Sequence, residues 1–198
     1  MSCINLSFSE EQLSALREKA YRFLDEKRIP HVRGCEEEAA HLAERWGESR
    51  SAAAAAGILH DCTKRLKYEE QLQLIKKYDI VCDASLLRAP KLLHAVTGAA
   101  LAELEFSMPE EIVRAIRWHT TGRPAMSLLE KIIYLADYIE PGRDFPGVQE
   151  LRKAAYEDLN GAMALGLRMS LEDLQSRGTQ PHPDTQNAYD YYINNPER

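Results

Sequence analysis

The sequence predicts an all-α fold in a single domain. Apolar residues recur at spacings of three and four along almost the whole chain, and no stretch shows the sustained period-two alternation that is typical of strands. The chain has 198 residues, a length at which one sizeable hydrophobic core can form. We therefore expect one domain over 1–198, with its core over about 28–145. C-terminal helices over about 148–194 are expected to complete the pocket in which this domain binds its ligand.

The first third of the chain is expected to form three helices, over about 9–27, 31–46 and 49–60. Ser7 or Ser9 can begin the first of them, because a serine hydroxyl accepts a hydrogen bond from a free amide at a helix start. The segment Arg28–Pro30 is expected to interrupt this helix, and Gly47 to end the second. The third helix contains an alanine run at 52–56, which lets another helix approach closely.

Five further helices are expected, over about 68–78, 90–104, 109–119, 127–139 and 148–177. Proline and glycine residues such as Pro109 and Pro141-Gly142 separate them. The last segment, 178–198, is less regular, because Pro181 and Pro183 cannot lie inside a helix. A closing turn or helix over about 185–193 is compatible with its sequence.

Charge and cysteine content restrict the partners and the compartment. A net charge of −6 gives no general attraction for polyanions, so no nucleic-acid polymer is expected as a partner, whereas small phosphorylated ligands are compatible. The four cysteines (Cys3, Cys35, Cys62 and Cys82) form no CxxC pair, which suits a reducing cytoplasm. No apolar run approaches the roughly 20 residues of a membrane span, and no basic and apolar leader is recognisable. We expect a cytoplasmic protein without membrane contact; a homodimer is compatible with the sequence.

One His-Asp pair lies where a cation is needed. His60 and Asp61 end a helix of small and apolar residues that should be buried, and an unpaired carboxylate is costly there. Asp137 likewise interrupts the apolar face of its helix. Imidazole and carboxylate together suit borderline divalent metals such as iron, manganese, cobalt or zinc. We therefore expect a metal site formed by His31, His60, Asp61 and Asp137, which would activate water at neutral pH.

The candidate ligands occur in the order His31, His60-Asp61, His94, His119, Asp137. This ordered set resembles the HD-domain metal-dependent phosphohydrolases. Five segments are similar to one bacterial group among them, the YqeK family of symmetrical diadenosine tetraphosphate hydrolases: 57–64 (GILHDCTK), 93–95 (LHA), 118–122 (WHTTG), 136–143 (ADYIEPGR) and 182–185 (HPDT). The resemblance implies cleavage in the middle of the tetraphosphate to give two ADP. It also implies one or two metal ions, with iron as the native metal and manganese or cobalt as alternatives.

Several polar residues could contact the substrate. Lys64 lies one helical turn past Asp61, and Arg143 follows a Pro-Gly turn, so both could reach a bound phosphate. Thr120 and Thr121 offer hydroxyl and backbone donors, although Thr-Thr-Gly is also an ordinary turn. The expected catalytic residues are Asp61, Lys64, His94 and His119. The expected substrate-binding residues are Arg28, Lys64, His94, His119, Thr120, Thr121, Arg143, His182 and Thr185.

Alternatives remain open for some residues and for the function. His94 and His119 could bind a second metal, meet the phosphates, or be core histidines with one satisfied nitrogen. His41 lies on a charged helix and is expected to face solvent, and the role of His182 rests mostly on the resemblance. The alternative functions are another HD-type nucleotide phosphohydrolase and a non-catalytic module that senses nucleotides.

Overall fold

The computed structural model describes residues 6–195, and within this range it contains helices and no strand, which confirms the all-α prediction. The helices are α1 (Glu10–Ala20), α2 (Ile29–Trp46), α3 (Arg50–Leu59), α4 (Tyr68–Lys77), α5 (Ala84–Leu87), α6 (Leu93–Leu104), α7 (Glu110–Trp118), α8 (Leu128–Ile139), α9 (Val148–Glu157), α10 (Leu159–Ser176) and α11 (Pro183–Asn194). Short 3₁₀ turns cover Tyr21–Phe23, Glu26–Arg28 and Pro90–Leu92. The predicted domain limits, residues 1 and 198, lie outside the described range.

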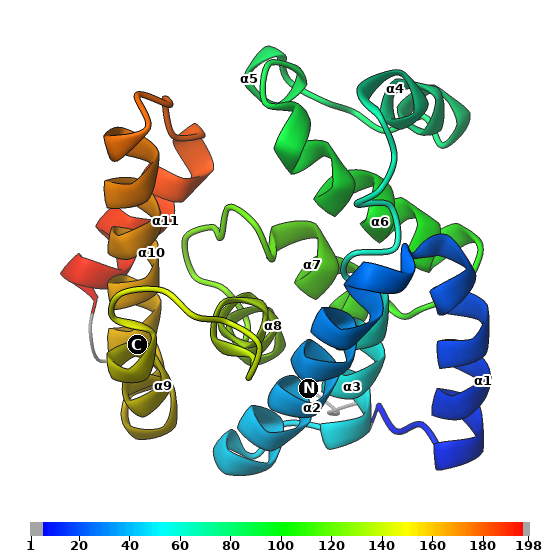
Figure 1. Cartoon of the computed structure of the whole chain (residues 1–198), viewed down its shortest axis with the longest axis horizontal. Coiled ribbons are helices and arrows are strands. Elements are labelled where there is room, and N and C mark those ends of the chain that lie inside the picture. Colours follow the sequence, from blue (N-terminus) through cyan, green and yellow to red (C-terminus); the bar gives the residue numbers. More distant parts are fainter. Residues whose placement is uncertain (1–5, 196–198) are drawn as a thin grey trace.

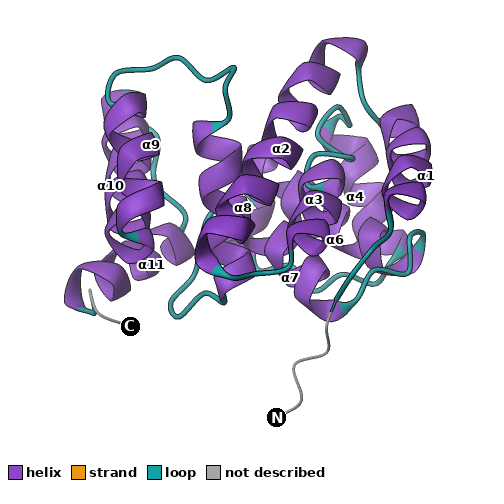
Figure 2. Ribbon diagram, turned by 90° about the horizontal axis from the view of Figure 1, so that it is seen from below, coloured by secondary structure: helices purple, strands orange, loops and turns teal. Residues whose placement is uncertain are grey.

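Helix α8 lies in the middle of the molecule (Figure 1). On one side it packs against α2, α3 and α7, and on the other against α9 and α10. Helices α9, α10 and α11 form a separate group on that second side in both ribbon views (Figures 1 and 2). Helices α4 and α5 lie above α6 at the top of Figure 1, and a small separate hydrophobic cluster there contains Leu86, Leu93 and Val96. The main core fills the remaining space between the helices.

The close contact between α2 and α3 follows from the small residues of α3. All five alanines from Ala52 to Ala56 are buried, and so is Gly57. A Cβ atom on Gly57 would lie only 2.8 Å from the Cα of Glu36 in α2. This glycine therefore allows the two helix backbones to approach more closely than any side chain would permit.

The N-terminal helix is shorter than expected. It ends at Ala20 instead of continuing to about Lys27, because Leu24 and Asp25 adopt extended backbone conformations between two 3₁₀ turns. Pro30 does not act as a breaker but lies in the first turn of α2, where the missing amide of proline costs no helix hydrogen bond. The predicted ending of α2 at Gly47 is confirmed, with φ of 76°.

The expected long helix over 148–177 is two helices. The break falls at Asp158, whose backbone is extended (φ −147°, ψ 99°) and whose carboxylate accepts a hydrogen bond from the amide of Gly161 at the start of α10. The short helix α5 was not expected at all. The closing helix is confirmed as α11, with Pro183 in its first turn.

Other predictions concern exposure and the cysteines. His41 is exposed, as expected. Cys35, Cys62 and Cys82 are free thiols, and Cys3 lies outside the described residues. Among the helices of the described range, none combines the length and apolar character needed to cross a membrane.

Candidate metal centre

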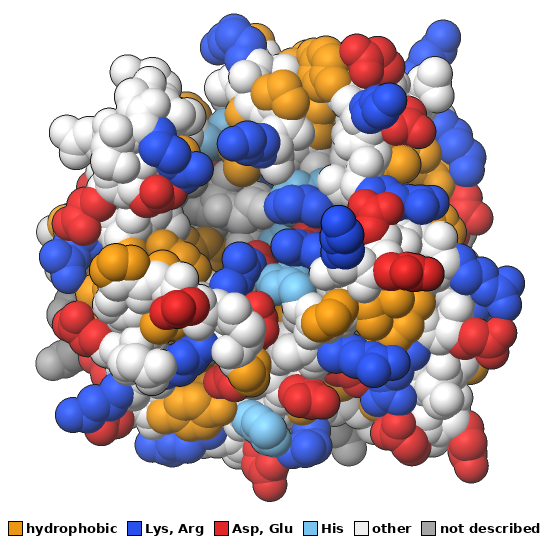
Figure 3. All heavy atoms as spheres, viewed as in Figure 1, with side chains coloured by type: hydrophobic (Ala, Val, Ile, Leu, Met, Phe, Trp, Pro, Cys, Tyr) orange, Lys and Arg blue, Asp and Glu red, His pale blue; other side chains and the backbone are white. Residues whose placement is uncertain are grey.

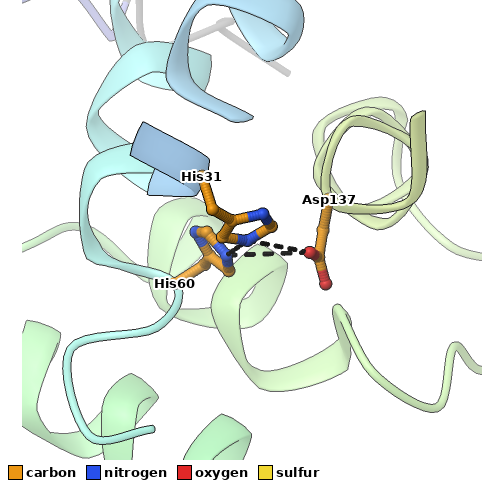
Figure 4. A group of neighbouring side chains, drawn as sticks. All are labelled: His31, His60 and Asp137. Atoms are coloured by element: carbon orange, nitrogen blue, oxygen red, sulfur yellow. Dashed lines mark hydrogen bonds and ion pairs between the residues drawn. The ribbon is translucent and has the colours of Figure 1, made fainter. Parts of the chain in front are cut away.

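The four predicted ligands come together at the ends of three helices. His31 lies in the first turn of α2, His60 and Asp61 directly follow α3, and Asp137 lies in the last turn of α8. The Nε2 atom of His31 is 3.2 Å from Nε2 of His60 and 3.2 Å from Oδ1 of Asp137 (Figure 4). Oδ2 of Asp61 is 3.6 Å from Nε2 of His31 and 3.4 Å from Nε2 of His60. Ligand atoms bound to one ion at about 2.0–2.2 Å lie at similar mutual distances, so the four residues fit a single cation.

A second group of ligand atoms shares Asp61 with the first. Oδ1 of Asp61 lies 3.2 Å from Nε2 of His94 and 3.8 Å from Nε2 of His119. The two imidazole nitrogens are 3.1 Å apart, and all three residues are buried. Oδ1 of Asp61 is buried without a hydrogen-bond partner in the described part of the chain. This unsatisfied carboxylate oxygen fits a second cation between Asp61, His94 and His119.

The hydrogen bonds of the Nδ1 atoms show which nitrogen of each imidazole is available to a metal. The Nδ1 atoms of His60, His94 and His119 lie 2.7 to 2.8 Å from backbone carbonyl oxygens three residues earlier in the chain. A ring that donates from Nδ1 is left with a lone pair on Nε2. The lone pairs of neighbouring rings then point at one another across 3.1 to 3.2 Å, an arrangement that a shared cation stabilises.

Burial and neighbouring groups shift the pKa values of the candidate ligands. Burial, together with the nearby His94 and His60, lowers the pKa of His119 to about 3. Burial also lowers the pKa of His94. Burial alone would raise the pKa of Asp61, but His60 and His94 outweigh it and hold this pKa well below its usual range. The neutral imidazoles of His94 and His119 beside the ionised carboxylate of Asp61 are in the protonation states that bind a divalent metal. Burial alone would lower the pKa of His60, but Cys35 and Asp61 outweigh it and raise this pKa, so a metal that binds His60 must displace a proton.

Three cations border the two ligand groups. Arg28 donates from Nε to Oδ2 of Asp61 at 2.6 Å, and Arg143 donates from Nη2 to Oδ1 of Asp137 at 2.5 Å. Nζ of Lys64 lies 3.1 Å from Nε2 of His94. In the space-filling view, lysine and arginine side chains gather around a hollow in which histidine side chains are visible (Figure 3). The three predicted phosphate-binding cations are therefore next to the predicted metal ligands.

The remaining predicted substrate residues lie in two places. The hydroxyl of Thr121 donates to the carbonyl of Gly122 at 3.0 Å, whereas the hydroxyl of Thr120 is buried without a partner among the described residues. His182 caps α11, and its Nε2 lies 3.0 Å from Oγ of Ser85 in α5. Thr185 is buried in the first turn of α11. The contacts of His182 therefore join α5 to α11 and do not reach the ligand groups.

Glu140 belongs to the site but was not expected there. Its Oε1 lies 3.1 Å from Nδ1 of His31, and its Oε2 accepts a hydrogen bond from the amide of Gly142 at 2.6 Å. The residue is buried, and a Cβ atom on Gly34 would lie 2.6 Å from its Oε2. Glu140 thus orients His31 as carbonyl oxygens orient the other three histidines. Its spacing of three from Asp137, which puts both on one helix face, was the available signal.

Comparisons with known proteins agree with this geometry. A family model described as "HD domain" matches residues 28–142. The symmetrical bis(5'-nucleosyl)-tetraphosphatase of Bacillus subtilis is 41% identical, over 93% of this chain and 97% of its own. The protein with the same description from Halalkalibacterium halodurans is 42% identical, over 86% and 91%. A crystal structure from Clostridium acetobutylicum, described as an HD superfamily hydrolase involved in NAD metabolism, superposes with a TM-score of 0.88 at 38% identity, over 96% of this chain and 99% of that one. The chain therefore belongs to the HD domain family of metal-dependent phosphohydrolases.

Proposed function

We propose that this protein is a symmetrical bis(5'-nucleosyl)-tetraphosphatase that hydrolyses diadenosine tetraphosphate to two ADP. The observation that carries the proposal is the pair of ligand groups joined by Asp61 and bordered by three cations. Such a site suits a substrate with several negatively charged phosphates. The relatives that cover most of the chain at 41 and 42% identity support the choice of substrate.

The ligand groups have distinct roles in this proposal. His31, His60, Asp61 and Asp137 hold one divalent ion, and Asp61 with His94 and His119 holds a second. Ions in these positions supply Lewis-acid chemistry that activates water and neutralises phosphate charge. We propose iron as the native metal, with manganese or cobalt as substitutes, because the mixed nitrogen and oxygen donors suit these ions better than magnesium or calcium.

The cations and hydroxyl groups hold the substrate. Arg28, Lys64 and Arg143 bind phosphoryl oxygens and stabilise the charge that develops on them. The unpartnered hydroxyl of Thr120, assisted by Thr121, donates to a further phosphate oxygen. His182 and Thr185, at the junction of α5 and α11, lie toward a nucleoside end of the substrate. If only one ion binds, His94 and His119 instead contact the attacked phosphoryl group directly.

The reaction breaks the central anhydride of the tetraphosphate. A water oxygen bonds to one of the two central phosphorus atoms, and the bond from that atom to the central bridging oxygen breaks. One ADP leaves with the bridging oxygen, the other ADP carries the water oxygen, and the two protons of the water are released when both ADP products are fully ionised. Cations fixed on the rim of the site can hold one ADP-like half in register, so that one anhydride lies in line with the attacking water.

Analysis of the first products tests this proposal. Purified protein loaded with iron(II), manganese(II) or cobalt(II) is mixed with diadenosine tetraphosphate in ¹⁸O-labelled water, and early time points are separated by chromatography. We expect ADP as the sole nucleotide product, with half of its molecules carrying one label. ATP together with AMP would show asymmetrical cleavage by another kind of nucleotide phosphohydrolase. Metal binding and nucleotide binding without turnover would instead favour a sensing module.

The proposed surroundings of the protein follow from its charge. We propose a cytoplasmic enzyme whose partner is a small dinucleoside polyphosphate and not a nucleic-acid polymer, because the net charge of −6 repels polyanions outside the local cationic site. A homodimer stays compatible with the sequence, and light scattering coupled to size-exclusion chromatography would test it.

A further inference from the structure

The turn that follows α8 reaches back to the metal ligands. It covers residues 140–143 and is closed by a hydrogen bond from the amide of Arg143 to the carbonyl of Glu140 at 2.9 Å. The carboxylate of Glu140 accepts one hydrogen bond from the turn, at Gly142, and lies 3.1 Å from Nδ1 of His31. The position of this turn therefore sets the position of the group that orients His31.

The side chain of Arg152, in α9, donates hydrogen bonds to three backbone carbonyls in and next to this turn. Arg152 donates from Nε to the carbonyl of Ile139 at 2.9 Å. It also donates from Nη2 to the carbonyls of Glu140 at 2.8 Å and Arg143 at 3.0 Å. The last carbonyls of a helix have no partner within the helix, and a planar guanidinium can reach several of them at once. Among the described residues, no carboxylate lies within ion-pair distance of Arg152, so these carbonyls are its polar partners.

We propose that Arg152 is a positioning residue for the metal centre, which acts by fixing the turn of Glu140 and thereby the orientation of His31. The inference rests on the proposed metal site, whose ligand His31 it concerns. Arg152 lies beyond residues 28–142, the part that matches the HD domain model. The C-terminal helices would then contribute to metal binding although they supply none of the proposed ligands.

Metal affinity without substrate is the first measurement. The variants are Arg152→Gln, which removes the guanidinium, and Arg152→Lys, which keeps the charge but cannot reach three separate carbonyls. We expect both to bind manganese(II) about tenfold more weakly in calorimetric titrations, the lower end of the range for groups that orient metal ligands. We also expect the visible absorption of the cobalt(II)-loaded protein to change, because His31 moves. Melting curves of the metal-free variants show whether they are folded.

Arg45→Gln is the matched control. Arg45 also donates to a backbone carbonyl of α9, that of Tyr156 at 2.9 Å, but it lies away from the turn. Its loss should weaken the attachment of α9 to α2 and leave manganese affinity and the cobalt spectrum unchanged. If Arg45→Gln weakens metal binding as much as Arg152→Gln does, general attachment of α9 explains the effect and the proposal fails.

A double variant tests the route through Glu140. Glu140→Gln should itself weaken manganese binding about 10–100-fold, because His31 and Gly142 face different oxygens of Glu140 and the amide replaces one of these acceptors by a donor NH₂ group. If Arg152 acts through Glu140, the double variant should bind manganese within about twofold of Glu140→Gln alone. Losses that multiply would overturn this route, and wild-type affinity in both Arg152 variants would overturn the proposal. Asymmetrical cleavage by the wild-type enzyme would contradict the proposed function and leave this inference standing.

Discussion

At the scale of single residues, Asp61 is the one that both ligand groups share. It offers Oδ2 to the first ligand group, 3.4 Å from His60, and Oδ1 to the second, 3.2 Å from His94. A buried carboxylate oxygen beside the neutral imidazoles of His94 and His119 needs a positive partner, and Arg28 reaches only Oδ2. The orphaned Oδ1 explains why a change at this residue should affect both proposed ions together.

Asp61→Ala should remove the metal and abolish hydrolysis while the helical fold survives. The substitution deletes the ligand that the two groups share, and the packing of the helices that carry the other ligands does not depend on it. Elemental analysis and far-ultraviolet circular dichroism of the purified variant check this expectation. Asp173→Ala, at an exposed ion pair on α10, serves as the control and should retain its metal. Undiminished iron or manganese in the Asp61 variant would show that the ligand assignment is wrong.

Arg143→Ala should affect the substrate more than the metal. The guanidinium is not a metal ligand. We expect its loss to lower kcat/KM by an amount that corresponds to about 1.5–3 kcal/mol of activation free energy, the range for a hydrogen bond between charged groups. Metal occupancy at saturating manganese should stay complete. Steady-state kinetics and metal analysis measure the two quantities separately, with Arg168→Ala on α10 as a control for an exposed arginine. Unchanged kinetics would assign Arg143 a purely structural role.

At the scale of helices, the site depends on how closely α2 and α3 pack. His31 lies in the first turn of α2 and His60 directly follows α3, so the separation of these helices sets the distance between two ligands. Gly57 lies where α3 meets the backbone of α2 at Glu36. Its carbonyl also lies 2.7 Å from Nδ1 of His60. One glycine thus links helix packing to the orientation of a ligand.

Gly57→Ala should destabilise the protein by about 1–3 kcal/mol, because the new methyl group would lie 2.8 Å from a backbone atom that cannot rotate away. It should also weaken metal binding, since His31 and His60 are pushed apart. Gly98→Ala is the matched control in α6, where the nearest atoms would lie at an ordinary 3.5 Å. Helix propensity should make that variant neutral or more stable by up to about 1 kcal/mol. Urea unfolding of both variants measures the difference, and equal stabilities would contradict the packing argument.

At the scale of the whole molecule, the ligands connect segments that are distant in sequence. They come from α2, the turn after α3, α6, the turn after α7, and α8. The chain carries a net charge of −6, yet Arg28, Lys64 and Arg143 border these ligands, and several lysine and arginine side chains lie around the hollow in which histidine side chains are visible (Figure 3). Bound metal should therefore hold five segments of the helical domain together and offset the charge of an anionic substrate at one place.

Removal of the metal should lower the melting temperature. A ligand that binds only the folded state at 100 times its dissociation constant stabilises it by about 2.7 kcal/mol. For a domain of this size that corresponds to a shift of about 5–11 °C. Differential scanning calorimetry with and without a chelator measures the shift, and readdition of manganese(II) should reverse it. The Asp61→Ala variant should melt at the same temperature in both conditions; a chelator effect there would indicate metal bound elsewhere.

The sequence alone determined the helical class, most helix positions and the family resemblance, and it predicted the four candidate metal ligands that the fold brings together. Helix periodicity and capping are local properties, and the motifs around His60, His119 and Asp137 are short and contiguous. Tertiary structure decided the rest. The break at Asp158 and the early end of α1 follow from extended backbone conformations within helix-like sequence. The directions in which the two carboxylate oxygens of Asp61 point, and the proposed roles of Glu140 and Arg152, depend on contacts between distant segments. Periodicity cannot reveal such contacts, because the distance between two side chains on different helices is set by how closely those helices pack.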